Sequence, residues 1–274
     1  MSCHFATLGM FIIDEFSFLD EAGNPTAQII APQIGGGGTY ANIGARVWLP
    51  ASQVGMIIDH GSDFPPDMES KLAEFGKEMW IYRDQPSGTT RALNTYRGDH
   101  RRCVPEELDA LIKVLPQINI LSPNAEEALG LLSLPLPPSK RLIEEAAHKF
   151  LQQGVGPGGK GCVIIRSGSM GACVALKDQP MRWVPAFWSS KDEHKIVDVT
   201  GAGNSFLGGL AAGLLLENGD VYQASFHASV AASFVIEQAG LPTISVVDGT
   251  TLWNGDSPQR RLDELKKREI EVEG

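Results

Sequence analysis

The chain has 274 residues and a mass of 29.5 kDa, and 43% of its residues are apolar, which is enough for one large α/β domain with a buried core. Its formal net charge of -10 and pI near 5.1 oppose broad binding to nucleic-acid backbones or anionic membranes. Small molecules are therefore the expected partners.

Short apolar runs predict the strands of a mostly parallel sheet, at residues 7–14, 54–59, 79–82, 118–121 and 162–165. The first run ends on Asp14, which places a carboxylate at the C-terminal edge of the predicted sheet, where ligands bind in open α/β folds. Two stretches with polar faces, residues 15–34 and 86–98, predict a small β lid beside that edge.

Helical patterns alternate with these strands, at residues 41–49, 68–75, 106–115, 125–132, 142–152, 205–217 and 222–239. Such alternation is typical of βαβ units and predicts a single α/β domain over residues 1–274, with a sheet covered on both faces. The charged tail, residues 254–274, predicts a Lys/Glu-rich helix or a frayed end with a solvated face.

An early glycine run precedes the first predicted helix. Four glycines, residues 35–38, let the main chain approach a ligand closely, and Asn42 in the following helix can both donate hydrogen bonds to sugar hydroxyls and accept from them. Taken alone, such a run is more often a flexible turn. Together with Asp14, the run favours a site for a hydroxylated small molecule that includes Gly37 and Gly38.

A second motif follows the strand predicted at residues 118–121. Asn124 at a helix start with Glu127 three residues later has the spacing of a capping box. The same two side chains are also candidates to position a hydrated Mg²⁺, because this ion keeps waters between itself and protein carboxylates. The two interpretations are compatible.

Two further glycine segments have simple explanations. Residues 154–161 have the spacing of a phosphate-binding P-loop, but Gly161 replaces the required Ser or Thr and the segment leads from a helix into a strand, so we predict a connecting turn. Residues 166–171 predict a hairpin, and Gly168 and Gly171 would line a nucleotide or only complete the turn.

The late run Gly201-Ala202-Gly203-Asn204 is the most informative stretch. It opens a helix of small residues, and the unpaired amides and positive dipole end of such a helix stabilise a bound anion. We predict a phosphate site formed by the amides of residues 201–204. A helix-capping turn is the simpler alternative.

Other site classes are disfavoured. Phe206 stands where a dinucleotide-binding fingerprint needs its third glycine, and the six histidines show no zinc-site spacing. The cysteines, which are Cys3, Cys103, Cys162 and Cys173, form no C-x-x-C pair, so we predict reduced thiols. Because residues 1–16 lack a basic leader and no later run approaches a membrane span, we expect a cytoplasmic protein.

In their order and spacing, three motifs resemble those of the ribokinase/PfkB family of carbohydrate kinases. They are Gly37-Gly38-x-x-x-Asn42, Asn124-x-x-Glu127 and Asp198-x-x-Gly201-Ala202-Gly203. The similarity runs over residues 7–242, and the chain resembles in particular the fungal branch that is associated with maintenance of a killer virus. The resemblance implies a three-layer α/β/α sandwich with a β lid, ATP and Mg²⁺ as cofactors, a sugar or nucleoside substrate, and pairing of two chains through their lids.

The resemblance also implies roles for single residues. Substrate hydroxyls would contact Asp14, Gly37, Gly38 and Asn42. The nucleotide would contact Asn124, Arg166, Gly168, Gly171 and Asp198, with residues 228–236 beside the adenine. Glu127 would hold the metal through water, and Gly201, Ala202, Gly203 and Asn204 would form the anion hole.

Four departures from the family pattern bear on activity. Asn204 replaces the catalytic Asp, and an amide cannot take a proton from an attacking hydroxyl. Val199 and Arg166 replace threonines, and the Arg166 guanidinium would grip a phosphate. A βα unit is missing between about residues 97 and 118, which predicts a gap in the sheet with an unpaired edge.

We therefore expect a pseudokinase candidate that binds ATP and a hydroxylated small molecule with weak or lost phosphotransfer. Two alternatives stay open. One is a scaffold that uses the fold for a protein partner, and the other is a kinase that works with Asn204, for which Asp198 is a candidate replacement base.

Overall fold

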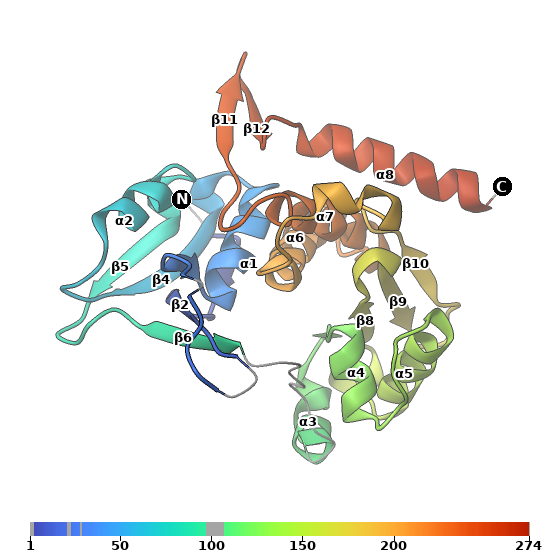
Figure 1. Cartoon of the computed structure of the whole chain (residues 1–274). Helices are drawn as coiled ribbons and strands as arrows, with labels where there is room; N and C mark the ends of the chain where they lie inside the picture. Colours follow the sequence, from blue (N-terminus) through green and yellow to red (C-terminus); the bar gives the residue numbers. More distant parts are fainter. Residues whose placement is uncertain (1–2, 21–22, 28, 97–106, 274) are drawn as a thin grey trace.

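The computed structural model describes residues 3–20, 23–27, 29–96 and 107–273. Its N-terminal half and the half that contains β8 to β10 lie on opposite sides of a central group of helices, with the C-terminal helix crossing above (Figure 1). No described helix is long and apolar enough to span a membrane.

The N-terminal half contains a parallel three-stranded sheet. Its strands are β1 (Phe5–Thr7), β4 (Val54–His60) and β5 (Trp80–Asp84), in the order β1-β4-β5. The alternate residues Val54, Met56 and Ile58 of β4 are buried in the core that also includes α1 (Gly37–Arg46) and α2 (Pro66–Ala73). On the opposite face Ile57 is 51% exposed and its partner Ile81 is 56% exposed, so this face is open.

The second sheet has the order β10-β9-β8-β7, with β7 (Ile120–Leu121) parallel to β8 (Cys162–Arg166). β9 (Ala172–Leu176) and β10 (Arg182–Val184) follow antiparallel. Val163 and Ile165 of β8 share a core with α4 (Ala125–Leu131) and α5 (Lys140–Gln152), whereas Cys162 and Ile164 share the other core with α6 (Ala202–Leu216) and α7 (Val221–Val235). Helices therefore cover both faces, which confirms the α/β fold class.

The sheet is divided, because β1 and β7 are end strands of separate sheets among the described residues. This division agrees with the gap expected from the missing βα unit between about residues 97 and 118. The two halves are joined by α1 and α6 at a close glycine crossing. A Cβ on Gly44 would lie 2.1 Å from the Ser205 carbonyl oxygen, and one on Gly208 would lie 1.8 Å from that of Ala41.

The first predicted strand is wrong in its extent. The chain forms β1, breaks around Gly9, where a Cβ would lie 2.6 Å from the Gly38 nitrogen, and re-enters as β2 (Ile12–Phe18). β2 pairs with β3 (Gln33–Gly35) and β6 (Arg91–Tyr96) in a separate three-stranded sheet. Asp14 therefore lies within this small sheet and not at the end of a central strand.

The C-terminal tail also differs from the prediction of a solvated face. After the hairpin β11 (Ile244–Val247) and β12 (Thr250–Trp253), α8 (Pro258–Glu273) packs along α7 with Leu262 and Leu265 buried. The remaining elements are α3 (Leu108–Val114) and short 3₁₀ turns, namely Ala51–Gln53, Lys77–Met79, Leu115–Gln117, Pro157–Gly159, Gly168–Met170 and Ser190–Lys195.

Cysteine chemistry follows the burial of the side chains. Cys3, Cys162 and Cys173 are free thiols, as predicted, and Cys103 lies outside the described residues. Burial raises the pKa of the Cys162 and Cys173 thiols to about 12. These two thiols are therefore protonated at neutral pH and unreactive.

Candidate functional site

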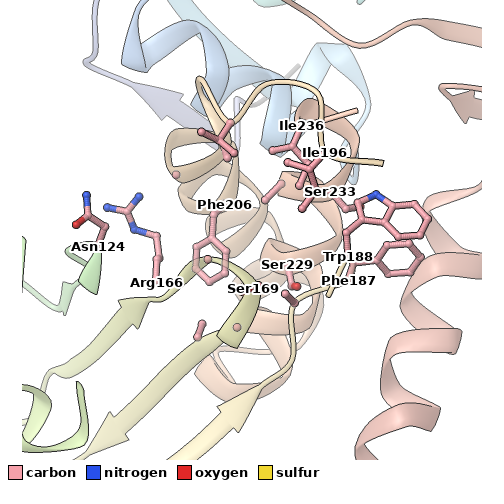
Figure 2. Close-up of a pocket in the computed structure, with 18 residues that line it drawn as sticks. Asn124, Arg166, Ser169, Phe187, Trp188, Ile196, Phe206, Ser229, Ser233 and Ile236 are labelled. Atoms are coloured by element: carbon pink, nitrogen blue, oxygen red, sulfur yellow. The ribbon is translucent and has the colours of Figure 1, made fainter. Parts of the chain in front are cut away.

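A pocket of about 310 Å³ lies between the β8-β9 hairpin, the first turns of α6 and the face of α7. Figure 2 shows Asn124 and Arg166 at one end and Phe187 with Trp188 at the other. Six residues predicted from the sequence line it, and so do four from the segment 228–236. They are Asn124, Arg166, Gly168, Gly171, Ala202 and Gly203, with Ser229, Ala232, Ser233 and Ile236.

The head of α6 borders this pocket with unpaired amides. Gly201 is the N-cap, with φ of 78°, and a Cβ there would lie 2.2 Å from the Tyr40 ring, so the turn requires glycine. Among the described residues, the N–H groups of Gly201, Gly203 and Asn204 meet no acceptor, although Ser205 N–H donates to the Gly201 carbonyl at 2.8 Å. The apolar stretch Val197-Asp198-Val199 before this turn would be expected as a short strand, but residues 196–200 form none.

The Arg166 guanidinium stands directly beside these amides. Its Nε and Nη2 donate to the Ser122 carbonyl at 3.2 and 3.0 Å, and Nη2 lies 3.8 Å from Glu127 Oε2. A Cβ on Gly203 would lie 1.9 Å from Nη1. Burial lowers the pKa of Arg166 and Glu127 opposes this shift, but the side chain stays charged at neutral pH.

Asn124 and Glu127 form the predicted capping box. Glu127 N–H donates to Asn124 Oδ1 at 2.8 Å, and Asn124 N–H donates to Glu127 Oε2 at 2.9 Å. A Mg²⁺ ion at Glu127 would share this carboxylate with a backbone donor and with a guanidinium. Within the described ranges no three His, Cys, Asp or Glu side chains gather to hold a metal ion. Because a nearby fixed cation repels a dication, these residues do not fit a bound Mg²⁺.

Asp198 lies outside the pocket lining. Its Oδ1 accepts from Thr200 N–H at 2.9 Å, which closes a local turn before the helix. Burial, Asp198 and Asp14 together raise the pKa of Tyr40 well above its ordinary value. Asp198 thus shapes the entrance to α6 together with Tyr40.

Three aromatic side chains that the sequence analysis did not select line the pocket, namely Phe187, Trp188 and Phe206. The Trp188 indole N–H donates to Glu237 Oε1 at 2.8 Å, which fixes the ring. The signal in the sequence is the Phe-Trp pair, which follows β10 after Pro185 and Ala186 and belongs to none of the glycine motifs. The pocket therefore joins a cationic end to an aromatic end.

The residues predicted to bind substrate lie apart from this pocket. Asp14 Oδ1 accepts from Asn94 Nδ2 at 2.9 Å, and a Cβ on Gly35 would meet Asp14 Oδ2 at 1.8 Å. A Cβ on Gly37 would lie 3.2 Å from Asn204 Oδ1, so the structure brings these two predicted residues together.

The other two predicted substrate residues are held in packed surroundings. A Cβ on Gly38 would lie 2.3 Å from the Gly9 carbonyl oxygen. Asn42 is fully buried, and neither polar atom of its amide meets a partner among the described residues. Asn42 therefore presents no surface to a ligand in this conformation.

Comparison with known proteins shows to which family this chain belongs. The profile described as "pfkB family carbohydrate kinase" matches residues 91–246, which is more than half of the chain. The chain belongs to the pfkB family of carbohydrate kinases. Family members bind ATP, generally with Mg²⁺.

Two fungal relatives align over almost all of the chain. An uncharacterized protein of Schizosaccharomyces pombe is 30% identical, with 95% of this chain and 92% of the relative covered. Protein MAK32 of Saccharomyces cerevisiae is 28% identical, with 95% and 90% covered, and fits the predicted fungal branch. The first alignment spans 341 positions, more than the 274 residues of this chain, so the relative has segments without a counterpart here.

Solved structures show the same fold at low identity. Ribokinase from Thermotoga maritima has a TM-score of 0.62 at 17% identity and covers 96% of this chain and 99% of its own. Ribokinase from Arabidopsis thaliana, solved with ribose and ATP, has a TM-score of 0.62 at 16% identity, covering 97% and 99%. The fold of this chain is therefore ribokinase-like.

Proposed function

We propose that this protein binds ATP in the pocket between the β8-β9 hairpin and α6, and a hydroxylated small molecule, a sugar or nucleoside, on the side of Asp14 and Asn204. The observation that carries the proposal is the juxtaposition of three amides, which meet no acceptor in the described part of the chain, and a guanidinium at one end of the pocket with aromatic and aliphatic walls at the other. The first end suits phosphates, and the second suits a purine.

Phosphotransfer by this protein is proposed to be weak or lost. Asn204 lies beside Gly37 at the head of α6, where the family pattern has a carboxylate, and its amide cannot act as a general base. Positioning of the reactants and stabilisation of charge supply most of the rate acceleration in phosphoryl transfer. A slow residual reaction is therefore compatible with this site.

Binding of ATP is the direct test. Isothermal titration calorimetry and thermal-shift measurements with ATP, with and without a panel of sugars and nucleosides, should show saturable binding of ATP. Adenosine should bind more weakly than ATP, because it lacks the groups that meet the amides and the guanidinium. If ATP does not bind at millimolar concentrations under any of these conditions, the proposal is refuted.

A second candidate function is that of a scaffold, which uses its surface to bind a protein partner. The open face of β4 and β5 favours this function. Leu8, Met10 and Ile57 line a second cavity on this side, and Ile81 adjoins it. Exposed apolar side chains next to an unpaired strand edge are suited to association with a second copy of the chain. Sedimentation velocity would detect such a homodimer, and Ile57→Asp should dissociate it.

A further inference from the structure

We propose that Arg166 takes the place of the divalent cation in this protein, so that nucleoside triphosphate binds without Mg²⁺. The inference rests on the proposed binding of ATP in the pocket described above. It concerns the source of positive charge at the phosphates, which in the family generally includes Mg²⁺.

The first argument is the free hydrogen-bonding capacity of the guanidinium. Nε and Nη2 both bind the Ser122 carbonyl oxygen, and the backbone N–H of Arg166 donates to the Pro123 carbonyl at 3.0 Å. These bonds fix the side chain on the end of β8. Nη1 donates to no acceptor in the described chain and faces Gly203. A planar guanidinium with one edge anchored and another edge free is suited to hold a phosphate oxygen.

The second argument is the excess of positive charge at this corner. The amides of Gly201, Gly203 and Asn204 form the positive end of α6, and Arg166 adds a full charge beside them. Glu127 is the carboxylate paired with Arg166, and at 3.8 Å it makes no hydrogen bond to it. Since the side chain of Arg166 is only 19% exposed, water screens this charge weakly. The corner is therefore stabilised by an anion, and the more negative metal-free triphosphate suits it best.

The third argument is that the Glu127 carboxylate already has partners within the protein. Its Oε2 accepts the Asn124 N–H in the capping box and faces the guanidinium, so the carboxylate is already used to begin α4. A hydrated dication at this oxygen would displace a cap and lie against a fixed cation. A metal ion brought in by the nucleotide would thus compete with Arg166 for the same phosphate oxygens.

The experiment compares the Kd of ATP by calorimetry in excess EDTA and in excess Mg²⁺. We expect the wild-type protein to bind in EDTA at least as tightly as in Mg²⁺. Binding in Mg²⁺ that is lost in EDTA would overturn this inference and leave the proposed function standing. No ATP binding in either buffer would overturn both.

Substitutions at Arg166 test the role of the guanidinium, and a substitution at Glu127 tests the role of the carboxylate. Arg166→Thr should weaken ATP binding in EDTA by about 10- to 100-fold, the loss of a charged hydrogen bond, while Arg166→Lys retains part of the affinity. Arg83→Thr is the matched control, because Arg83 also pairs with a carboxylate, Asp59, but on β5 away from the pocket. Its Kd should equal that of the wild type.

Glu127→Gln tests the metal role directly, because Gln at this position retains the capping box. If Glu127 held the metal, the variant would lose affinity in Mg²⁺ alone, and that result would overturn the inference. We expect unchanged or tighter binding in both buffers, since removal of the carboxylate leaves Arg166 free for phosphate. Thermal unfolding of each variant confirms that it is folded.

Discussion

The guanidinium carbon of Arg261 on α8 lies 3.8 Å from the ring centroid of Phe234 on α7, and the Arg261 side chain is almost completely buried. The same guanidinium lies 4.9 and 5.2 Å from the rings of Phe187 and Trp188, which line the pocket beside α6. It also pairs with Glu237, the carboxylate that fixes the Trp188 indole. α8 therefore supports the aromatic end of the pocket from behind.

Replacing Arg261 by Met should destabilise the protein strongly. The change leaves Glu237 and Asp256 without their buried partner, which costs about 3 to 5 kcal/mol in the free energy of unfolding. Urea unfolding followed by tryptophan fluorescence measures this cost. Arg260→Met is the control: Arg260 also pairs with Asp256 but is half exposed, so we expect a loss of less than about 1 kcal/mol. Equal effects of the two substitutions would contradict the structural role assigned to Arg261.

Restoring the carboxylate by Asn204→Asp should increase phosphotransfer to a sugar or nucleoside. A positioned general base contributes about 10²- to 10⁴-fold in rate. The assay is transfer of the terminal phosphate of ATP across a panel of acceptors, with Asn204→Ala as the control that adds no base. If the aspartate variant binds ATP and still transfers nothing, the division of the sheet, and not the missing base, is the main defect.

A methyl group at Gly203 should weaken ATP binding without unfolding the protein. Its Cβ would lie 1.9 Å from Arg166 Nη1, the far end of a flexible side chain, so the guanidinium moves away from the amides. We expect Gly203→Ala to lose about 1.5 to 3 kcal/mol of binding, the value of a hydrogen bond to a charged group. Because the displaced guanidinium also strains its hydrogen bonds to the Ser122 carbonyl, the free energy of unfolding should fall by at most about 1.5 to 3 kcal/mol, partly offset by the better helix propensity of Ala. Calorimetry and urea unfolding measure the two quantities.

The small sheet should respond to acid through Asp63. Hydrogen bonds from Thr89 and Arg91 lower the pKa of Asp63 from 3.8 to about 2. A lowered folded-state pKa means that the carboxylate stabilises the fold above pH 3.8, and that this contribution is lost as the pH falls toward 2. The difference in melting temperature between the wild type and Asp63→Asn should therefore shrink over this window. A difference that stays constant with pH would exclude this role for Asp63.

Much of the architecture was predictable because local pattern and tertiary packing agree. The runs at 54–59 and 162–165 became β4 and β8, and the capping box at Asn124 and Glu127 formed as expected. The position of Asp14 was not predictable, since a continuous apolar run gives no sign that Gly9 packs against Gly38 and redirects the chain.

The aromatic end of the pocket and the role of α8 could not be predicted from the sequence either. In the sequence, Arg261 is one of many charged residues in the C-terminal tail. Its burial among Phe187, Trp188 and Phe234 depends on contacts between residues far apart in the chain. Local periodicity cannot report such contacts. Arg166, by contrast, was identified as an unusual residue at its position, but only the structure relates its Nη1 to Gly203.

The division between β1 and β7 has a consequence for the way the chain opens. Helix packing at Gly44 and Gly208 joins the two sides, so they can separate without breaking a ladder of strand hydrogen bonds. In native-state deuterium labelling, amides of β1 and β7 should exchange through small local openings. Amides of β8 and β9 should exchange only through global unfolding. The protein would then behave as two cooperative units that share a helical hinge.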